Sequence, residues 1–372
     1  MSGLAKVVAQ LAAARRSMAE TPAEDSGGLL KPMAGFGSNP GNLIARTFIP
    51  ANLPKGAPLV VVLHGCTQNA AQYDRGSGWS QLAASEGFAL LYPEQQRSNN
   101  SNLCLNWFAP EDARRGQGEA LSISQMVKHM TAAHGLDETR VYVTGLSAGG
   151  AMTSALLASY PELFAGGAII AGLPFASANS LPEALARMRG QGSPGRNELA
   201  SRARTAAPHS RRMPSVSVWH GTQDAVVDPS NSAAIVDQWR DLHGLGTATG
   251  TIDSVDGHRH ETWRDADGRA IIERYDIRGM GHGTPLATGG ADACGKAGPH
   301  MLEAGICSTS KIAAFWGLTS TTRKSVESKH EIDRPVTNLT PEPANPQVRD
   351  GKRGGDVQSV IEKALRSAGL MK

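Results

Sequence analysis

Short apolar runs alternate along the chain with longer stretches in which apolar residues recur at helical spacing. Residues 59–63 and 88–93 are continuous apolar runs, whereas residues 121–134 carry apolar side chains three and four positions apart. An uninterrupted apolar strand is typical of a parallel sheet that is covered on both faces, because neither face of the strand meets water. The pattern therefore predicts an α/β protein with a doubly wound, mostly parallel sheet and helices on both faces.

The same alternation extends over most of the chain. Further strands are predicted at residues 43–50, 140–144, 165–173, 216–221 and 269–276, and further helices at residues 79–85 and 231–243. Residues 175–212 have no strand pattern and are rich in alanine, arginine, glycine and proline. Insertions above the carboxyl edge of such a sheet often form lids, so this segment is either a small cap or a surface excursion.

The two ends of the chain differ in composition from the predicted catalytic domain, which we place at residues 42–317. Residues 1–41 are predicted to contain an amphipathic helix over residues 4–18, followed by a linker rich in glycine, proline, serine and asparagine. That helix would pack on the body or lie on an apolar surface such as a polymer granule. Residues 318–372 are predicted to be a polar, disordered tail with a short terminal helix.

Composition narrows the classes of function. The chain has 372 residues, of which 40% are hydrophobic and 19% charged, and this is enough for one large α/β domain. A net charge of only +3 and an aromatic content of 5% argue against nucleic-acid binding by a basic, aromatic-lined face. No run of about 18 apolar residues occurs, so we expect no transmembrane helix.

Cysteine content and the N-terminus point to different compartments. The four cysteines, Cys66, Cys104, Cys294 and Cys307, allow two disulfides in three alternative pairings. They do not have the spacing of zinc ligands, so we expect neither a metal nor a cofactor. The N-terminus lacks the order of basic, apolar and cleavage-site residues that marks a secretory signal, and a chain kept in the cytosol would have reduced thiols.

The strongest chemical signal lies at residues 145–149, which read GLSAG. They join the predicted strand at residues 140–144 to an alanine- and leucine-rich helical pattern, the context of a nucleophile elbow in an α/β-hydrolase. The elbow holds the serine, here Ser147, on a strained turn that leaves room only for small residues such as Gly145 and Gly149. The alternative is a glycine-rich turn with an incidental serine.

A nucleophilic serine needs a base, and the base needs a carboxylate that orients it. In an α/β-hydrolase these residues follow in the order Ser, Asp, His. Asp224 and His282 each follow a predicted strand, at the edge where such a sheet gathers its site. We therefore assign Ser147 as nucleophile, His282 as base and Asp224 as the acid. Asp228 is the alternative acid, although it precedes a proline and is typical of a turn or a helix N-cap.

The remaining histidines of interest have simpler interpretations. His64 and His220 each precede a glycine at the end of a strand, and we expect both to be structural residues hydrogen-bonded beneath the site. His258, His260 and His300 are predicted to lie in polar loops and to be ordinary solvated side chains.

An oxyanion hole needs two preorganised backbone donors. One is the N–H of Ala148, directly after the nucleophile. The other should come from the turn after the strand at residues 59–63, and we assign the N–H of Cys66. A buried, packing role for the Cys66 side chain is compatible with this assignment, because only its backbone is used.

Six segments now combine into a resemblance to a known family. They are residues 63–68 (LHGCTQ), 92–95 (YPEQ), 104–108 (CLNWF), 145–152 (GLSAGGAM), 220–224 (HGTQD) and 281–283 (GHG). Together they resemble the polyhydroxybutyrate (PHB) depolymerase family of esterases, α/β-hydrolases that are related to acetylxylan and feruloyl esterases. The resemblance covers roughly residues 42–317.

The resemblance implies the same triad and the same use of the Cys66 amide in the oxyanion hole. It also places Trp107 near the acyl pocket, with a core aromatic as the alternative interpretation. Finally, it implies disulfides that pair Cys66 with Cys104 and Cys294 with Cys307.

The expected activity is that of a serine carboxylic-ester hydrolase, which cleaves 3-hydroxybutyrate polyester or oligomers through an acyl-enzyme. The alternatives are an esterase for short acyl or feruloyl groups on carbohydrate and a granule- or surface-binding protein without turnover. Secreted members of the family usually carry a signal peptide and often a polymer-binding domain, and neither is recognisable here. The resemblance thus implies an extracellular location, with the cytoplasm as the alternative, and the terminal helices are candidate contacts with polymer granules.

Overall fold

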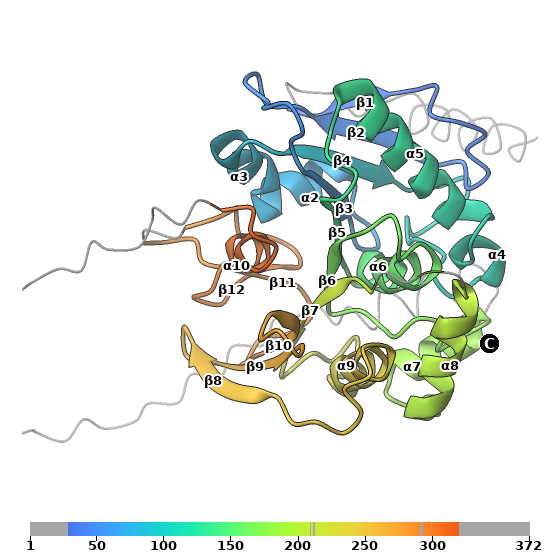
Figure 1. Ribbon diagram of the computed structural model, residues 1–372, viewed down its shortest axis with the longest axis vertical. Coiled ribbons are helices and arrows are strands. Elements are labelled where there is room, and N and C mark those ends of the chain that lie inside the picture. Colours follow the sequence, from blue (N-terminus) through green and yellow to red (C-terminus); the bar gives the residue numbers. More distant parts are fainter. Residues whose placement is uncertain (1–28, 209, 211–212, 291–292, 320–372) are drawn as a thin grey trace, which may run out of the picture. The chain divides into compact units, whose positions relative to one another are not determined.

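The computed structural model describes residues 29–208, 210, 213–290 and 293–319. The described residues up to Leu318 belong to one compact unit built around a ten-stranded sheet (Figure 1). In spatial order its strands are β1 (Lys31–Met33), β2 (Ile44–Phe48), β4 (Ala89–Glu94), β3 (Leu59–Leu63), β5 (Val141–Leu146), β6 (Gly166–Ile170), β7 (Ser215–Gly221), β10 (Ala270–Ile277), β9 (His258–Arg264) and β8 (Thr251–Val255).

The centre of the sheet is parallel, as the apolar runs predicted. Strands β4, β3, β5, β6, β7 and β10 are parallel to one another, and the two strands at each edge pair antiparallel. The chain moves outward from β3 to β4 and returns to the other side of β3 with β5. This reversal is a topological switch point, where loops at the carboxyl ends of strands diverge and leave room for a site.

Helices cover both faces of the sheet (Figure 1). They are α2 (Ala70–Ser77), α3 (Trp79–Glu86), α4 (Pro110–Ala113), α5 (Gly118–His134), α6 (Ala148–Ser159), α7 (Leu181–Met188), α8 (Arg196–Ala206), α9 (Ser230–Leu242) and α10 (Ser308–Phe315). Helices α2, α3 and α10 pack on one face, and α5, α6, α8 and α9 on the other. None of the helices in the described residues is long and apolar enough to cross a membrane.

Strand β3 shows why the apolar runs are continuous. All of its side chains are buried, and they alternate between two cores. Leu59, Val61 and Leu63 belong to the core under α5 and α6, whereas Val60 and Val62 belong to the core under α2 and α3. Since successive side chains of a strand point to opposite faces, burial of both faces requires every position to be apolar.

The edges of the sheet were not predicted. Strand β1 lies in the predicted linker and pairs with β2, so the folded body begins before residue 42. Strands β8 and β9 form an antiparallel extension next to β10. Strands β1 and β8 are largely exposed and polar, so their side chains lack the apolar pattern and backbone hydrogen bonds define them. The predicted helix at residues 4–18 and the tail from residue 320 onward lie outside the described residues.

The described part of residues 175–212 forms α7 and α8 and no strand. Helix α8 packs against α6 and α9, so it belongs to the helical layer on one face of the sheet. The end of α7 approaches the carboxyl edge, where the carbonyl of Met188 accepts a hydrogen bond of 2.7 Å from the N–H of Asp228. A lid movement of α7 stays a prediction.

Candidate active site

Ser147 occupies a strained turn between β5 and α6. Its φ is 58° and its ψ is −117°, a left-handed backbone conformation that non-glycine residues rarely adopt. Its N–H donates a hydrogen bond of 2.9 Å to the carbonyl of Ile170 at the end of β6, which ties the turn to the sheet. A strained serine at a strand–helix junction is the geometry of a nucleophile elbow.

The two glycines of the elbow are required by close backbone contacts. A Cβ on Gly145 would lie 2.5 Å from the carbonyl carbon of Gly149. A Cβ on Gly149 would lie 2.5 Å from the carbonyl oxygen of Leu63, in β3. Neither contact is with a flexible side chain that could move aside, so any larger residue at these two positions would displace the serine.

Asp224 and His282 meet at the carboxyl edge of the sheet, although 57 residues separate them in the chain. The Nδ1–H of His282 donates to Oδ2 of Asp224 over 2.7 Å. The other carboxylate oxygen accepts hydrogen bonds of 2.9 Å from the N–H groups of Val226 and Val227. Asp228 does not contact His282, and its carboxylate accepts from the N–H of Ser230.

The carboxylate of Asp224 is buried but remains ionised. Burial alone would raise its pKa, yet hydrogen bonds from His220 and His282 and the charge of His282 hold the pKa well below its ordinary value. An ionised carboxylate can only accept, so Nδ1 of His282 carries the proton and Nε2 is left as a proton acceptor. This is the tautomer that a general base for a serine hydroxyl requires.

Within the described residues, Ser147 Oγ makes no hydrogen bond to His282 in this conformation. Such contacts are often long before substrate binds and shorten in the complex. The structure thus brings Asp224 and His282, the predicted acid and base, together directly, and it places Ser147, the predicted nucleophile, on the strand–helix turn of the same sheet edge.

The turn after β3 leaves one backbone donor free. The N–H of Thr67 donates to Asn102 O and that of Gly65 to Gln68 Oε1. Among the described residues, the intervening N–H of Cys66 has no acceptor. The N–H of Ala148 lies at the first position of α6, where no intrahelical acceptor exists. Because β3 and β5 are neighbours, both amides lie at the switch point.

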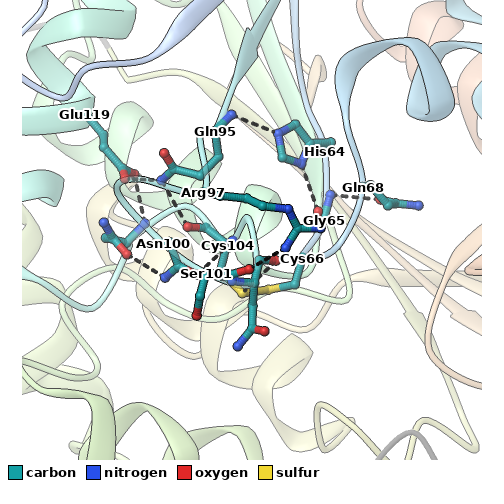
Figure 2. The surroundings of a disulfide bond; sticks show 12 residues. His64, Gly65, Cys66, Gln68, Gln95, Arg97, Asn100, Ser101, Cys104 and Glu119 are labelled. Carbon is teal, nitrogen blue, oxygen red and sulfur yellow. Dashed lines mark hydrogen bonds between the residues drawn. A yellow bond between two sulfur atoms is a disulfide. The ribbon is translucent and has the colours of Figure 1, made fainter. Parts of the chain in front are cut away.

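His64 stabilises this turn in a neutral form. Its Nδ1–H donates to Gly65 O over 2.8 Å, while Nε2 accepts from the N–H of Gln95 over 3.1 Å (Figure 2). Burial lowers the pKa of His64, which agrees with a ring that donates at one nitrogen and accepts at the other. Its position agrees with a structural role beneath the site.

A disulfide and a buried carboxyl group connect the turn after β3 to the segment after β4 (Figure 2). Cys66 is bonded to Cys104. The side-chain amide of Gln95 donates to Cys104 O and to Glu119 on α5. Burial, followed by the charge of Asp112, raises the pKa of Glu119 to about 8. Gln95 and Glu119 were not singled out from the sequence, because a polar residue inside a helix or after a strand is not distinctive there.

The segment after His282 folds back onto it. Strand β11 (Thr284–Leu286) pairs with β12 (Met301–Glu303), and a disulfide joins Cys294 to Cys307. His300, like His258 and His260, was expected to be solvated, but it is half-buried, and its Nδ1 lies 3.2 Å from His282 O. The rings of His300 and His282 are edge to face with centroids 5.8 Å apart. No sequence signal marks this contact, because it depends on the β11–β12 pairing.

The expectation of a solvated side chain was also wrong for His258 and His260, which lie in β9. His258 is 7% exposed, and the ring of His260 contacts the carboxylates of Asp253 and Glu273.

Trp107 is 8% exposed and contacts Phe108 edge to face with ring centroids 5.8 Å apart. It belongs to the core under α5 and α6, so its packing role is visible in the structure. A role in the acyl pocket stays a prediction. Among the described residues, no group of three or more His, Cys, Asp or Glu side chains has an arrangement that could hold a metal ion.

The strand order, the elbow and the acid–base pair define an α/β-hydrolase. One solved structure with the same fold is the acetyl xylan esterase from Aspergillus awamori, with a TM-score of 0.66 and 23% identity. The match covers 78% of this chain and all of that one. The predicted fold class is thereby confirmed.

Sequence comparison identifies the family. Residues 45–263 match the family model for esterase PHB depolymerase. The chain is 45% identical over 295 residues to poly(3-hydroxyalkanoate) depolymerase C of Paucimonas lemoignei. The match covers 78% of this chain and 70% of that protein. It is also 31% identical over 268 residues to feruloyl esterase B of Talaromyces stipitatus, covering 69% and 72%. The chain belongs to the esterase PHB depolymerase family, and its class of activity is carboxylic-ester hydrolysis.

Proposed function

We propose that this protein hydrolyses the ester bonds of 3-hydroxybutyrate polyester or its oligomers through an acyl-enzyme on Ser147. The observation that carries the proposal is the 2.7 Å hydrogen bond between Asp224 and His282 at the sheet edge that also bears the strained serine. A binding protein on the same fold would not need a serine elbow and an oriented imidazole together.

In the proposed mechanism Ser147 Oγ attacks the ester carbonyl carbon while His282 Nε2 takes its proton. The N–H groups of Cys66 and Ala148 donate to the oxygen that becomes negative in the tetrahedral intermediate. Collapse of the intermediate breaks the bond to the alcohol, which leaves with the proton from His282. Water then attacks the acyl-enzyme with the same proton transfers, and the acid is released as Ser147 is restored.

Asp224 fixes the tautomer of His282 and stabilises the imidazolium that forms when the proton is taken. It does so as an anion, since, despite its burial, hydrogen bonds from His220 and His282 hold the pKa of Asp224 well below its ordinary value. The Cys66 amide is held in place from two directions: by the ring of His64 through Gly65, and by the disulfide to Cys104.

The substrate class is proposed from the relatives. The depolymerase of Paucimonas lemoignei is 45% identical to this chain, whereas the feruloyl esterase of Talaromyces stipitatus is 31% identical. The higher identity favours a hydroxyalkanoate ester. The second relative supports an alternative, an esterase for short acyl or feruloyl groups on carbohydrate.

The test compares three substrates: amorphous PHB, a soluble butyrate ester and methyl ferulate, with the Ser147→Ala variant as blank. We expect release of 3-hydroxybutyrate by the wild-type protein alone. Hydrolysis of only the soluble esters would refute the polymer substrate and leave the esterase chemistry. Turnover by Ser147→Ala above trace would refute the assigned nucleophile.

Contact with the polymer is a separate part of the proposal. The terminal segments at residues 1–28 and 320–372 are the candidate granule contacts. Their removal should lower the rate on PHB granules by more than tenfold and change the rate on a soluble ester by less than twofold. Equal rates on granules before and after removal would refute this part.

A further inference from the structure

His220 lies at the carboxyl end of β7, four residues before the carboxylate that orients the base. Its side chain is 1% exposed. It is therefore a second histidine beside Asp224, and it takes no part in the proton transfers proposed above.

The contacts of His220 determine its tautomer. Its Nε2 lies 2.8 Å from Val227 O, which can only accept, so Nε2 carries a proton. The same Nε2 lies 3.3 Å from Oδ2 of Asp224, the oxygen that also accepts from His282. The Nε2–H of His220 thus lies between the carbonyl of Val227 and the carboxylate of Asp224.

These contacts give the carboxylate of Asp224 a complete set of donors. Oδ1 accepts from Val226 and Val227, and Oδ2 faces the N–H groups of His282 and His220. The backbone donors fix one oxygen. The rings of His282 and His220 together determine the direction of the other oxygen, Oδ2.

The other ring nitrogen of His220 carries a cost in stability. Its Nδ1 is buried and has no hydrogen-bond partner among the described residues. A buried polar atom without a partner costs free energy of folding, and an apolar side chain of similar size avoids that cost. His220 thus carries this cost at Nδ1 while its Nε2 is the donor to Val227 O and to Asp224.

We propose that His220 is a positioning residue, which holds the Asp224 carboxylate in the plane and direction that orient His282. The inference rests on the proposed function of the Ser147–Asp224–His282 site. In this proposal His220 acts on catalysis through Asp224 and does not contact the substrate.

Loss of this donor has a predictable electrostatic effect. Without the His220 N–H, the Asp224 carboxylate is less stabilised and attracts the imidazolium of His282 more strongly, so the acidic limb of the kcat/KM profile moves to higher pH. Other acidic groups near His220 are already paired. Asp228 accepts from Ser230, and Asp276, opposite His220 in β10, pairs with Arg259 and Arg274.

The test uses two substitutions at His220 and one matched control. His220→Leu removes the donor, whereas His220→Gln keeps an N–H at a reach similar to that of Nε2. His243→Leu is the control, because His243 also donates through Nε2 to a backbone carbonyl, that of Pro214, but lies at the far end of α9. Each variant is assayed for kcat, KM, pH profile and Tm on a soluble butyrate ester.

We expect His220→Leu to lower kcat by about tenfold or more, as loss of a supporting hydrogen bond commonly does, with KM within about twofold. Its Tm should also fall, because Val227 O and the Asp224 carboxylate lose a buried donor. His220→Gln should recover kcat to within about threefold of wild type. His243→Leu should leave kcat and the acidic limb as they are.

Two results would overturn the inference. One is a wild-type kcat and an unmoved acidic limb in His220→Leu. The other is an equal loss of kcat in the leucine and glutamine variants, which assigns His220 a packing role, because glutamine keeps the donor. The low-field proton resonance of the His282 Nδ1–H gives a readout without turnover. Its displacement in His220→Leu supports the inference even if the protein hydrolyses no ester, so the two proposals fail separately.

Discussion

The two loops that complete the site are held in different ways. The loop after β3 carries the Cys66 amide, and it is held by a buried network of His64, Gln95 and Glu119 and by a disulfide at Cys66 itself. The loop after β10 carries His282, and it is held by the Asp224 carboxylate and by the β11–β12 pair. Its disulfide begins twelve residues after the base, at Cys294.

We propose from this difference that the two disulfides serve different purposes on the two sides. An oxyanion donor is a backbone group whose direction depends on the turn, so a crosslink at that residue restrains a reacting element. A base is a side chain whose direction depends on its hydrogen-bonded partner, so a remote crosslink restrains only the fold around it. Substitutions on the two sides should separate these effects.

The largest effect is expected where the base meets the acid. Asp224→Asn keeps the shape of the side chain but replaces the ionised acceptor, so His282 loses its tautomer and kcat should fall by about 10³- to 10⁴-fold. The matched change Asp228→Asn alters a carboxylate that contacts Ser230 instead, and kcat should stay within about threefold. Steady-state kinetics on a soluble ester measure both, and a larger loss in the Asp228 variant would move the acid to that residue.

The next largest effect is expected at the disulfide of the oxyanion side. Replacing Cys66 and Cys104 by alanine keeps the amide but frees its turn, so kcat should fall by about 10- to 100-fold. The closed loop has a sequence separation of 38, for which chain entropy predicts a loss of roughly 4 kcal/mol in the free energy of unfolding. Kinetics and chemical denaturation of the double variant test both parts, and an unchanged kcat would contradict a role for this crosslink in catalysis.

The disulfide of the base side should affect stability alone. Its sequence separation is 13, so the double alanine variant of Cys294 and Cys307 should lose roughly 3 kcal/mol in the free energy of unfolding. At a temperature where this variant is fully folded, kcat should stay within about threefold of wild type. If kcat instead falls as far as in the Cys66 and Cys104 variant, the proposed contrast between the two sides is wrong.

The smallest expected effect is a pH dependence of stability, which arises from Glu119 on the side of the loop after β3. The folded protein raises the pKa of Glu119 to about 8, above the ordinary value of 4.5 that holds in the unfolded chain. Between these values the unfolded chain binds fewer protons, so this contribution to stability is complete below about pH 4.5 and is lost as pH rises through 8.

Glu119→Gln should remove this dependence, because glutamine has no charge to lose. From pH 5 to 9 the Tm of wild type should therefore fall more steeply than that of the variant, by about 5 °C or more. The slopes of Tm against pH are compared, and not the Tm values themselves, because glutamine also changes the hydrogen bonding. It offers one acceptor oxygen where the carboxyl group offers two. The exposed Glu111→Gln should keep the wild-type slope, and a parallel pair of curves for Glu119→Gln would show that this carboxyl ionises normally.

The centre of the fold and the candidate site could be predicted from the sequence for physical reasons. Buried parallel strands must be apolar at every position, as in β3, and the turn at Ser147 must have glycines where Cβ atoms would collide. Asp224 and His282 were recognisable because each follows a strand of the parallel set. Their prediction thus required the positions of the strands and the chain order Ser, Asp, His.

The parts that could not be predicted depend on contacts without a local pattern. Strands β1 and β8 are exposed, so no alternation of apolar side chains marks them. His300 contacts His282 through a loop pairing, and Glu119 is one of several buried polar residues of α5, together with Ser122, Ser124 and Thr131. The disulfide partners followed from the family resemblance, since spacing alone allows three pairings.

The most direct test of the account is the reaction of the protein with a fluorophosphonate, followed by peptide mapping of the adduct. An activated serine reacts with this reagent, whereas an ordinary hydroxyl does not. The account predicts one adduct, on Ser147, and a rate at least about 10³-fold lower in His282→Ala. An adduct on another residue, or an equal rate without His282, would contradict the claim that this pair forms the catalytic centre.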